Sequence, residues 1–217
     1  MKAFLFDMNG TMIDDMHFHL DIWYDVLTND LGAGLTREEV RSHMYGKNDE
    51  LLARVFGVGR FTADEIAAIS QRKEEKYQAI YKPHLTLLPG LHDFLESAYR
   101  ADIPMAIASA AIPFNIDFVL DNLDIRKYFK TVISAHDVFE SKPHPEVFEK
   151  AASILGVDPI SCIVFEDAPK GVEAALRAGM KSVVLTTMHS AEEFTNYGNI
   201  ITFASDYKDQ KVVRLIV

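Results

Sequence analysis

Short apolar runs alternate with segments of helical period along most of the chain. The apolar runs, rich in β-branched residues, occupy positions 3–6, 104–109, 131–135, 162–166, 182–187 and 200–204. In the intervening segments apolar residues recur every three or four positions, at 91–101, 113–123, 145–155 and 171–178. Such alternation predicts βαβ units around a parallel sheet. Because the apolar runs are almost continuous, we expect helices to cover both faces of that sheet.

A long segment after the first apolar run interrupts this alternation, because it contains no strand signal. Its first part places apolar residues at helical spacing, namely Met16, Leu20, Trp23 and Leu27. Thr36 and Thr62 each precede a glutamate by three positions, which is the pattern of a capping box, and a long helix is expected from Thr62 to about Lys82. We therefore predict an α/β fold: a Rossmann-like parallel sheet core, residues 1–13 and 86–217, with an inserted all-helical cap domain, residues 14–85.

Composition and charge narrow the classes of partner. The 217 residues carry a formal net charge of −10, whereas nucleic acids and anionic membranes select basic surfaces. The one cysteine, Cys162, lies in an apolar run, so we expect a buried thiol and no intramolecular disulfide. No apolar run is long enough to span a bilayer, and the apolar part of MKAFLFD is too short for a signal peptide. We expect a cytoplasmic monomer that binds neither nucleic acid nor membrane.

Polar side chains stand at or just beyond the ends of four predicted strands. Asp7 follows the first strand, Ser109 ends the second, Lys142 comes shortly after the third, and Glu166 and Asp167 end the fourth. Ligands of open α/β sheets bind beyond the carboxyl ends of the strands. We therefore expect these side chains to form one site.

The chemistry of this set suits phosphoryl transfer. Three converging carboxylates need a cation, and all-oxygen ligands favour Mg²⁺, which leaves room for a substrate phosphate. Lys142 would add a compact positive charge. The Ser109 hydroxyl, with Ala110 and the backbone N–H groups at the start of the next helix, would bind phosphate. Asp7 would then be the nucleophile, with a small phosphorylated metabolite as substrate.

Four sequence motifs resemble those of a known superfamily. DMNGT, IASA, SKPHP and FEDAPKGVEAALRAG are similar to the four motifs of the haloacid dehalogenase superfamily, and the helical insert resembles its cap domain. The similarity is greatest to the β-phosphoglucomutase-like branch of phosphatases and mutases. It implies an aspartyl phosphate on Asp7, an acid/base side chain at position 9, phosphate binding by Ser109, and the motif-three role for Lys142. It also implies Mg²⁺ held by Asp7, the main-chain carbonyl of residue 9 and Asp167, with Glu166 in direct or water-mediated support.

The resemblance further assigns substrate choice to the cap. The segments YGKND and RKEEKY resemble those that meet substrate, which nominates Lys47, Asn48 and Lys73. His19 is a further candidate in the cap.

Asn9 departs from the family pattern, which has aspartate there. An amide transfers no proton, and general acid/base catalysis is typically worth about 10²–10⁴-fold in rate. Two hypotheses follow: an impaired Mg²⁺-dependent phosphohydrolase, or a degenerate member that binds phosphate with little turnover. A sugar-phosphate mutase is a third alternative, which Ala111 weakens because phosphoglucomutases often carry serine there.

Overall fold

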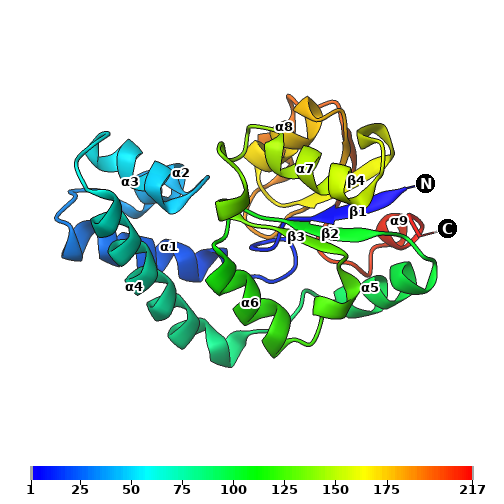
Figure 1. Cartoon of the computed structure of the whole chain (residues 1–217), viewed down its shortest axis with the longest axis horizontal. Helices are drawn as coiled ribbons and strands as arrows, with labels where there is room; N and C mark the ends of the chain where they lie inside the picture. Colours follow the sequence, from blue (N-terminus) through cyan, green and yellow to red (C-terminus); the bar gives the residue numbers. More distant parts are fainter. Residues whose placement is uncertain (1, 217) are drawn as a thin grey trace. The chain divides into compact units, whose positions relative to one another are not determined.

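A single parallel sheet organises the larger part of the chain (Figure 1). The computed structural model describes residues 2–216. The six strands are β1 Ala3–Phe6, β2 Met105–Ala108, β3 Thr131–Ile133, β4 Cys162–Glu166, β5 Lys181–Leu185 and β6 Ile200–Ala204. They lie in the order β3-β2-β1-β4-β5-β6, and every neighbouring pair is parallel. This confirms the predicted α/β class with a Rossmann-like parallel sheet.

Helices cover both faces of the sheet, as continuous apolar strands require. They are α5 Leu91–Arg100, α6 Pro113–Asn122, α7 Glu146–Leu155 and α8 Pro169–Arg177, with the short α9 Gln210–Val213 near the C-terminus. In Figure 1, α7 and α8 lie on one side of the strands, and α5 and α6 lie on the other. The side of α7 and α8 is packed by small and aliphatic residues such as Ala3, Leu5 and Val164.

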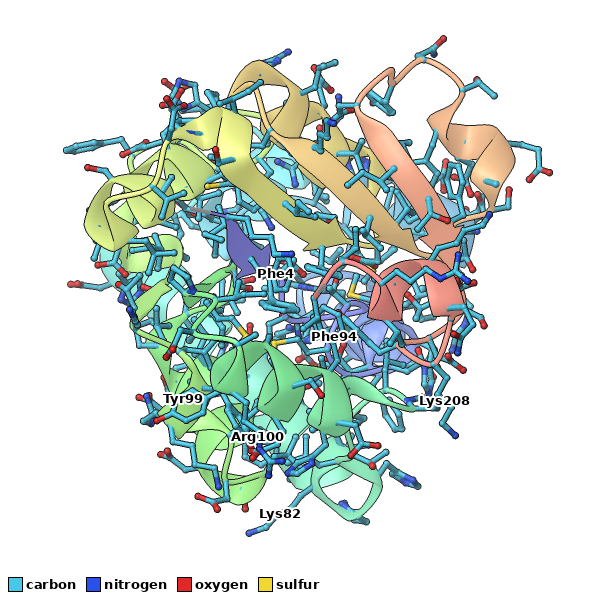
Figure 2. All side chains as sticks on the ribbon, turned by 90° about the vertical axis from the view of Figure 1, so that its right-hand side faces the viewer. Phe4, Lys82, Phe94, Tyr99, Arg100 and Lys208 are labelled. Carbon is cyan, nitrogen blue, oxygen red and sulfur yellow. The ribbon has the colours of Figure 1, made fainter. Side chains whose placement is uncertain are left out.

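The opposite side of the sheet is aromatic. Because successive strand residues point to opposite faces, Phe4 and Phe6 point away from Ala3 and Leu5. Phe6 stacks on Phe165 with ring centroids 4.6 Å apart, and Phe4 lies 5.4 Å from Phe94 of α5. In Figure 2, Phe4 and Phe94 lie near each other in the middle of the view, and Tyr99 and Arg100 of the same helix as Phe94 lie below them. Phe4 and Phe94 are buried, whereas Tyr99 is exposed. The central strand β1 is therefore fixed from both faces.

The rest of the chain forms a separate compact unit, Asp15–Leu85; the sheet unit comprises the residues up to Asp14 and from Thr86 onward. The unit Asp15–Leu85, called the helical unit below, contains the helices α1 Met16–Asp25, α2 Arg37–His43, α3 Asn48–Phe56 and α4 Ala63–Tyr81. It also contains a π-helical turn at Val26–Asp30 and a 3₁₀ turn at Lys82–His84. Both predicted capping boxes are present: Thr36 caps α2 with Glu39, and Thr62 caps α4 with Glu65.

The buried face of α1 differs from the expected apolar stripe. Met16 and Leu20 are only half-buried, whereas His19, Ile22 and Trp23 are buried. The stripe is displaced because a polar residue, His19, takes a core position that a hydrophobic pattern does not register. His19 therefore lies in the interior of the helical unit.

Two strands, β3 and β5, end two residues earlier than their apolar runs. The run at 131–135 leaves the sheet after Ile133, where Ser134 caps a short 3₁₀ helix, Ala135–Asp137. The run at 182–187 leaves the sheet after Leu185, and its last threonine contacts the turn after β1 instead.

No helix within residues 2–216 is both long and apolar enough to cross a membrane.

Candidate active site

Asp7 lies at the centre of the carboxyl edge of the sheet. Phe6, the last residue of β1, pairs with Ile107 of β2 and with Phe165 of β4. The backbone N–H of Asp7 donates to the Phe165 carbonyl at 3.0 Å. The ends of β2 and β4 therefore flank Asp7 at the spacing of neighbouring strands, about 4.8 Å. The structure thus brings Ser109 and the Glu166–Asp167 pair to either side of Asp7.

Lys142 connects two of these strand ends. Its Nζ donates to Oδ1 of Asp7 at 2.6 Å and to Oε1 of Glu166 at 2.7 Å. Burial by itself disfavours the ammonium, but the charges and hydrogen bonds of the two carboxylates outweigh it and raise the pKa of Lys142 above its ordinary value. Lys142 is therefore a permanent positive charge against the predicted nucleophile.

Glu146 fixes the loop that carries Lys142. This residue begins α7, and its carboxylate accepts hydrogen bonds from the backbone N–H groups of Phe139 and Glu140 at 3.0–3.1 Å. The same bonds lower the pKa of Glu146, so the carboxylate stays ionised at neutral pH. Lys142 thus projects from a loop whose backbone is tied to the first turn of α7.

Glu166 is fully engaged by the protein. Its Oε2 accepts hydrogen bonds from the backbone N–H groups of Asp167 and Ala168, each at 2.9 Å, and its Oε1 accepts a hydrogen bond from Nζ of Lys142. Asp167, also buried, accepts the hydroxyl of Thr11 at 3.4 Å. Among residues 2–216, no group of three or more His, Cys, Asp or Glu side chains is arranged to hold a metal ion. The Glu166 oxygens are thus bonded to Lys142 and to the backbone, and direct or water-mediated support of Mg²⁺ by Glu166 stays a prediction.

Two carboxylates still fit one type of cation. Mg²⁺ keeps several waters and is commonly held by one or two carboxylates together with substrate phosphates. Asp7 and Asp167 are the carboxylates that fit, because Asp167 accepts a hydrogen bond from Thr11 in the turn that Asp7 begins. The donor set at this edge of the sheet is thus compatible with Mg²⁺ without Glu166.

Three donors from distant parts of the sheet unit hold the turn after β1. Gly10 has a φ of +72°, which favours glycine, and its carbonyl accepts the hydroxyl of Thr187 at 2.6 Å. The carbonyl of Thr11 accepts the Tyr207 hydroxyl at 3.1 Å, and that of Met12 accepts a backbone N–H at 2.8 Å. Burial, with the charges of Asp7 and Asp167, raises the pKa of Tyr207, so its phenol stays protonated and can donate. The half-buried Asn9 lies within this fixed turn.

Thr11, Thr187 and Tyr207 support the site but were not predicted from the sequence. Thr11 belongs to the DMNGT motif and could have been nominated from it. Thr187 and Tyr207 carry no local signal, because both reach the turn from more than 175 positions away in the sequence.

Ser109 is buried between the end of β2 and the start of α6. Its backbone N–H donates to Ile133, and its Oγ accepts the N–H of Ala111 at 3.2 Å. The half-buried Ala110 lies between them, and α6 begins at Pro113. Because the Ser109 hydroxyl accepts the hydrogen bond from Ala111, its own proton stays available for donation to an anion. Helix N-termini also favour phosphate.

The helical unit contains a buried polar cluster. Lys73 Nζ lies 2.7 Å from Nδ1 of His19 and donates to both oxygens of Glu74 at 2.9–3.0 Å. Asn48 donates to Glu74 at 2.9 Å, so three of the predicted cap residues belong to this cluster. Lys47 is the N-cap residue of α3 and is half-buried. Burial lowers the pKa of Lys73 against the opposing effect of Glu74.

His19 links this cluster to a second buried carboxylate. Its Nε2 lies 3.2 Å from Oδ2 of Asp15, and the hydroxyl of Tyr77 donates to the same oxygen at 2.5 Å. If Lys73 donates to Nδ1, the imidazole proton lies on Nε2 and is donated to Asp15. Lys73, predicted from its sequence segment to meet substrate, is only 2% exposed. Its observed contacts are those of a structural centre for α1, α3 and α4.

Comparison with known proteins places most of the chain in one sequence group. A family model described as haloacid dehalogenase-like hydrolase matches residues 4–185. Hexitol phosphatase A of Escherichia coli (strain K12) is 31% identical over 209 residues, which cover 89% of this chain and 93% of that protein. Beta-phosphoglucomutase of Bacillus subtilis (strain 168) is 29% identical over 198 residues, which cover 84% and 82% of the two proteins.

A solved structure agrees over nearly the whole chain. It is CbbY from Rhodobacter sphaeroides, with one aspartate replaced by asparagine, in complex with xylulose-(1,5)bisphosphate. Its TM-score is 0.82 at 25% identity, and the match covers 96% of this chain and 95% of that chain. The agreement extends over both compact units of the chain.

Proposed function

Because the chain belongs to the haloacid dehalogenase-like hydrolase family, we propose that it is a Mg²⁺-dependent phosphohydrolase acting on a small phosphorylated metabolite through an aspartyl phosphate. The observation that carries this proposal is the buried ion pair between Lys142 and Asp7, at the strand edge where Ser109 also lies. The names of the phosphatase and mutase relatives support a sugar or polyol phosphate as the substrate class.

Each core residue has a defined task in this reaction. A carboxylate oxygen of Asp7 forms a bond to phosphorus while the bond from phosphorus to the leaving oxygen breaks. Lys142 and the Ser109 hydroxyl, with the N–H groups near Ala110, stabilise the negative oxygens of the transferring group. Attack of water on phosphorus then breaks the new bond, releases phosphate and returns Asp7 to its carboxylate form.

Asp7, Asp167 and the main-chain carbonyl of Asn9 are the groups that would hold Mg²⁺. When bound, the cation offsets negative charge on the phosphoryl group. Glu166 would support the site through Lys142 and the backbone of Asp167, as its hydrogen bonds indicate. An asparagine at position 9 keeps the carbonyl ligand, because that ligand belongs to the backbone.

Asn9 limits the rate rather than the assembly of the site. Its amide neither protonates the leaving oxygen nor takes a proton from the attacking water. A loss of about 10²–10⁴-fold in rate is expected, equivalent to roughly 3–5 kcal/mol of barrier. An acyl phosphate has a leaving group of low pKa that needs little protonation. It should therefore still phosphorylate Asp7, while hydrolysis of the product is slow.

We further propose that the helical unit selects the substrate through residues of its polar cluster and its neighbourhood. Lys47 and Asn48, at the start of α3, are half-buried and have polar groups suited to hydroxyls or phosphate. His19 and Lys73 are buried and would act mainly by fixing Asn48 through Glu74.

Trapping of the aspartyl phosphate tests the proposal. The chain is incubated with acetyl phosphate and Mg²⁺ and then analysed by intact mass, beside an Asp7→Asn variant and a sample with chelator. We expect one phosphoryl adduct that requires both Asp7 and Mg²⁺. Absence of any adduct would favour a protein that only binds phosphate. An adduct that is unaffected by Asp7→Asn would contradict the assigned nucleophile.

A further inference from the structure

We propose that Gly171 is a positioning residue for this reaction: its missing β-carbon leaves the space in which the Glu166 carboxylate holds Lys142 against Asp7. The inference rests on the proposed function for the reaction that it assists. It concerns a residue of helix α8 that lies directly beside the Glu166 carboxylate.

The space beside Gly171 is fully taken by Glu166. A β-carbon added to Gly171 would lie 1.8 Å from Oε1, 1.9 Å from Cδ and 2.5 Å from Oε2 of Glu166. All three distances are below 3.0 Å, so the side chain or the helix would have to move. Glu166 is itself 2% exposed, and its carboxylate is bonded to Lys142, Asp167 and Ala168. The carboxylate therefore cannot move without breaking at least one of these contacts.

Local helix formation does not explain a glycine at this position. Gly171 is the third residue of the nine-residue α8, and its φ is not in the left-handed region. Alanine would fit such a backbone and is the better helix former. The close approach of α8 to Glu166 is what requires glycine, because only a residue without Cβ leaves room for the carboxylate.

The contact reaches the nucleophile through two hydrogen bonds. Oε1 of Glu166, the atom nearest to an added β-carbon, accepts a hydrogen bond from Lys142 at 2.7 Å, and Lys142 also donates to Asp7 at 2.6 Å. A displaced Glu166 would release one of the two anchors of the ammonium. A misplacement of about 1 Å can cost about 10²-fold in rate even when the mutated residue is remote from the chemistry.

The test measures acetyl phosphate hydrolysis in an Asn9→Asp form, with Gly198→Ala as the matched control. Gly198 has no left-handed φ, and a β-carbon there would meet no atom within 4 Å, so alanine is accommodated without movement of its neighbours. We expect Gly171→Ala to lower kcat by about 10²-fold at unchanged KM, and Gly198→Ala to change neither. Adding Glu166→Asp to Gly171→Ala shortens the obstructed side chain and should restore part of kcat. A kcat for Gly171→Ala within about twofold of the control would overturn the proposal.

A spectroscopic measurement separates this inference from the proposed function. The buried ammonium of Lys142 should give a ¹H–¹⁵N signal, assigned by its loss in Lys142→Met. We expect Gly171→Ala to shift or remove it and Gly198→Ala to keep it. If the Asn9→Asp form releases no phosphate, the proposed function fails while this signal still decides whether Gly171 positions Lys142.

If Gly171→Ala does not fold, the Glu166→Gln variant tests the proposal instead. That variant keeps the size of the side chain and removes its charge. We expect the same loss of kcat and of the Lys142 signal, with the Mg²⁺ dissociation constant changed far less than by Asp167→Asn. An unchanged kcat and signal in Glu166→Gln would contradict the role of Glu166, and with it that of Gly171.

Discussion

Nζ of Lys142 lies 2.6 Å from Oδ1 of Asp7, and both side chains are buried at the carboxyl edge of the sheet. Glu166 shares the same ammonium at 2.7 Å. One positive charge therefore faces two carboxylates, with Asp167 as a third negative charge close to the same turn. The unbalanced negative charge makes this edge receptive to a cation, and it leads us to expect that Lys142 stabilises the site.

Replacement of Lys142 by methionine should destabilise the protein. Removing one partner of a buried ion pair leaves an uncompensated charge and typically costs about 3–5 kcal/mol. Mg²⁺ should recover part of this loss, because it supplies positive charge beside Asp7. Urea unfolding with and without Mg²⁺ measures the effect. The control is Lys170→Met, which removes a half-exposed pair with Glu173 and should cost at most about 1 kcal/mol. Equal losses in the two variants would contradict this account of Lys142.

Thr187 should contribute to both stability and rate through one hydrogen bond. Thr187→Val keeps the shape but leaves the Gly10 carbonyl without the hydroxyl that it accepts at 2.6 Å. A loss of about 1 kcal/mol in the free energy of unfolding is expected, with a lower kcat because the Asp7–Asn9 turn is less firmly held. Thr187→Ser keeps the hydroxyl and should retain kcat. If valine and serine behave alike in both measurements, the bond to Gly10 has no role.

Sequence alone predicted the sheet and the residues at its edge. The continuous apolar runs and the period-3.6 patterns are local, and strand ends in a parallel sheet share one edge, so Asp7, Ser109, Lys142 and Asp167 could be nominated together. Capping boxes at Thr36 and Thr62 were likewise predictable, because their partners lie three residues away.

The remaining features depend on contacts that no local pattern encodes. Glu166 and Asp167 are adjacent acids, and only the fold decides which of them contacts Lys142 and the backbone N–H groups. The segment around Lys73 suggested contact with substrate, and lysine is rarely fully buried unless it is paired. Its partner, Glu74, follows it directly in the sequence, but the burial of both comes from packing of α1, α3 and α4.

The polar cluster of the helical unit should show a reversal of pH dependence when Lys73 is removed. Burial alone would raise the pKa of Glu74, but Lys73 and His19 outweigh it and the net direction is down. In the parent, the contribution of Glu74 is therefore present above its unfolded pKa, about 4.3, and is lost as pH falls through the lower folded pKa. In Lys73→Met the folded pKa rises above the unfolded value. In this variant the contribution of Glu74 to the free energy of unfolding is present at low pH and is lost as pH rises through the raised folded-state pKa of Glu74.

The free energy of unfolding across the weakly acidic to neutral range tests this prediction, with Lys76→Met as control. Lys76 is on the same helix and forms an exposed pair with Asp25, so its removal should leave the pH profile nearly unchanged. Lys73→Met should lose stability relative to the parent as pH rises over this range. Parallel profiles for Lys73→Met and the parent would show that Glu74 does not depend on Lys73.

The role of Asn9 is the central claim, and Asn9→Asp tests it most directly. The measurement is Mg²⁺-dependent phosphate release from a panel of sugar and polyol phosphates, compared between this variant and the parent chain. Asn9 precedes Gly10, a dipeptide prone to deamidation, so isotopically resolved mass must first confirm that the parent retains its amide. We predict that aspartate raises the rate by about 10²–10⁴-fold, because nucleophile, lysine and phosphate donors are already in position. An unchanged rate on every substrate of the panel would contradict the conclusion that this site lacks only a proton carrier.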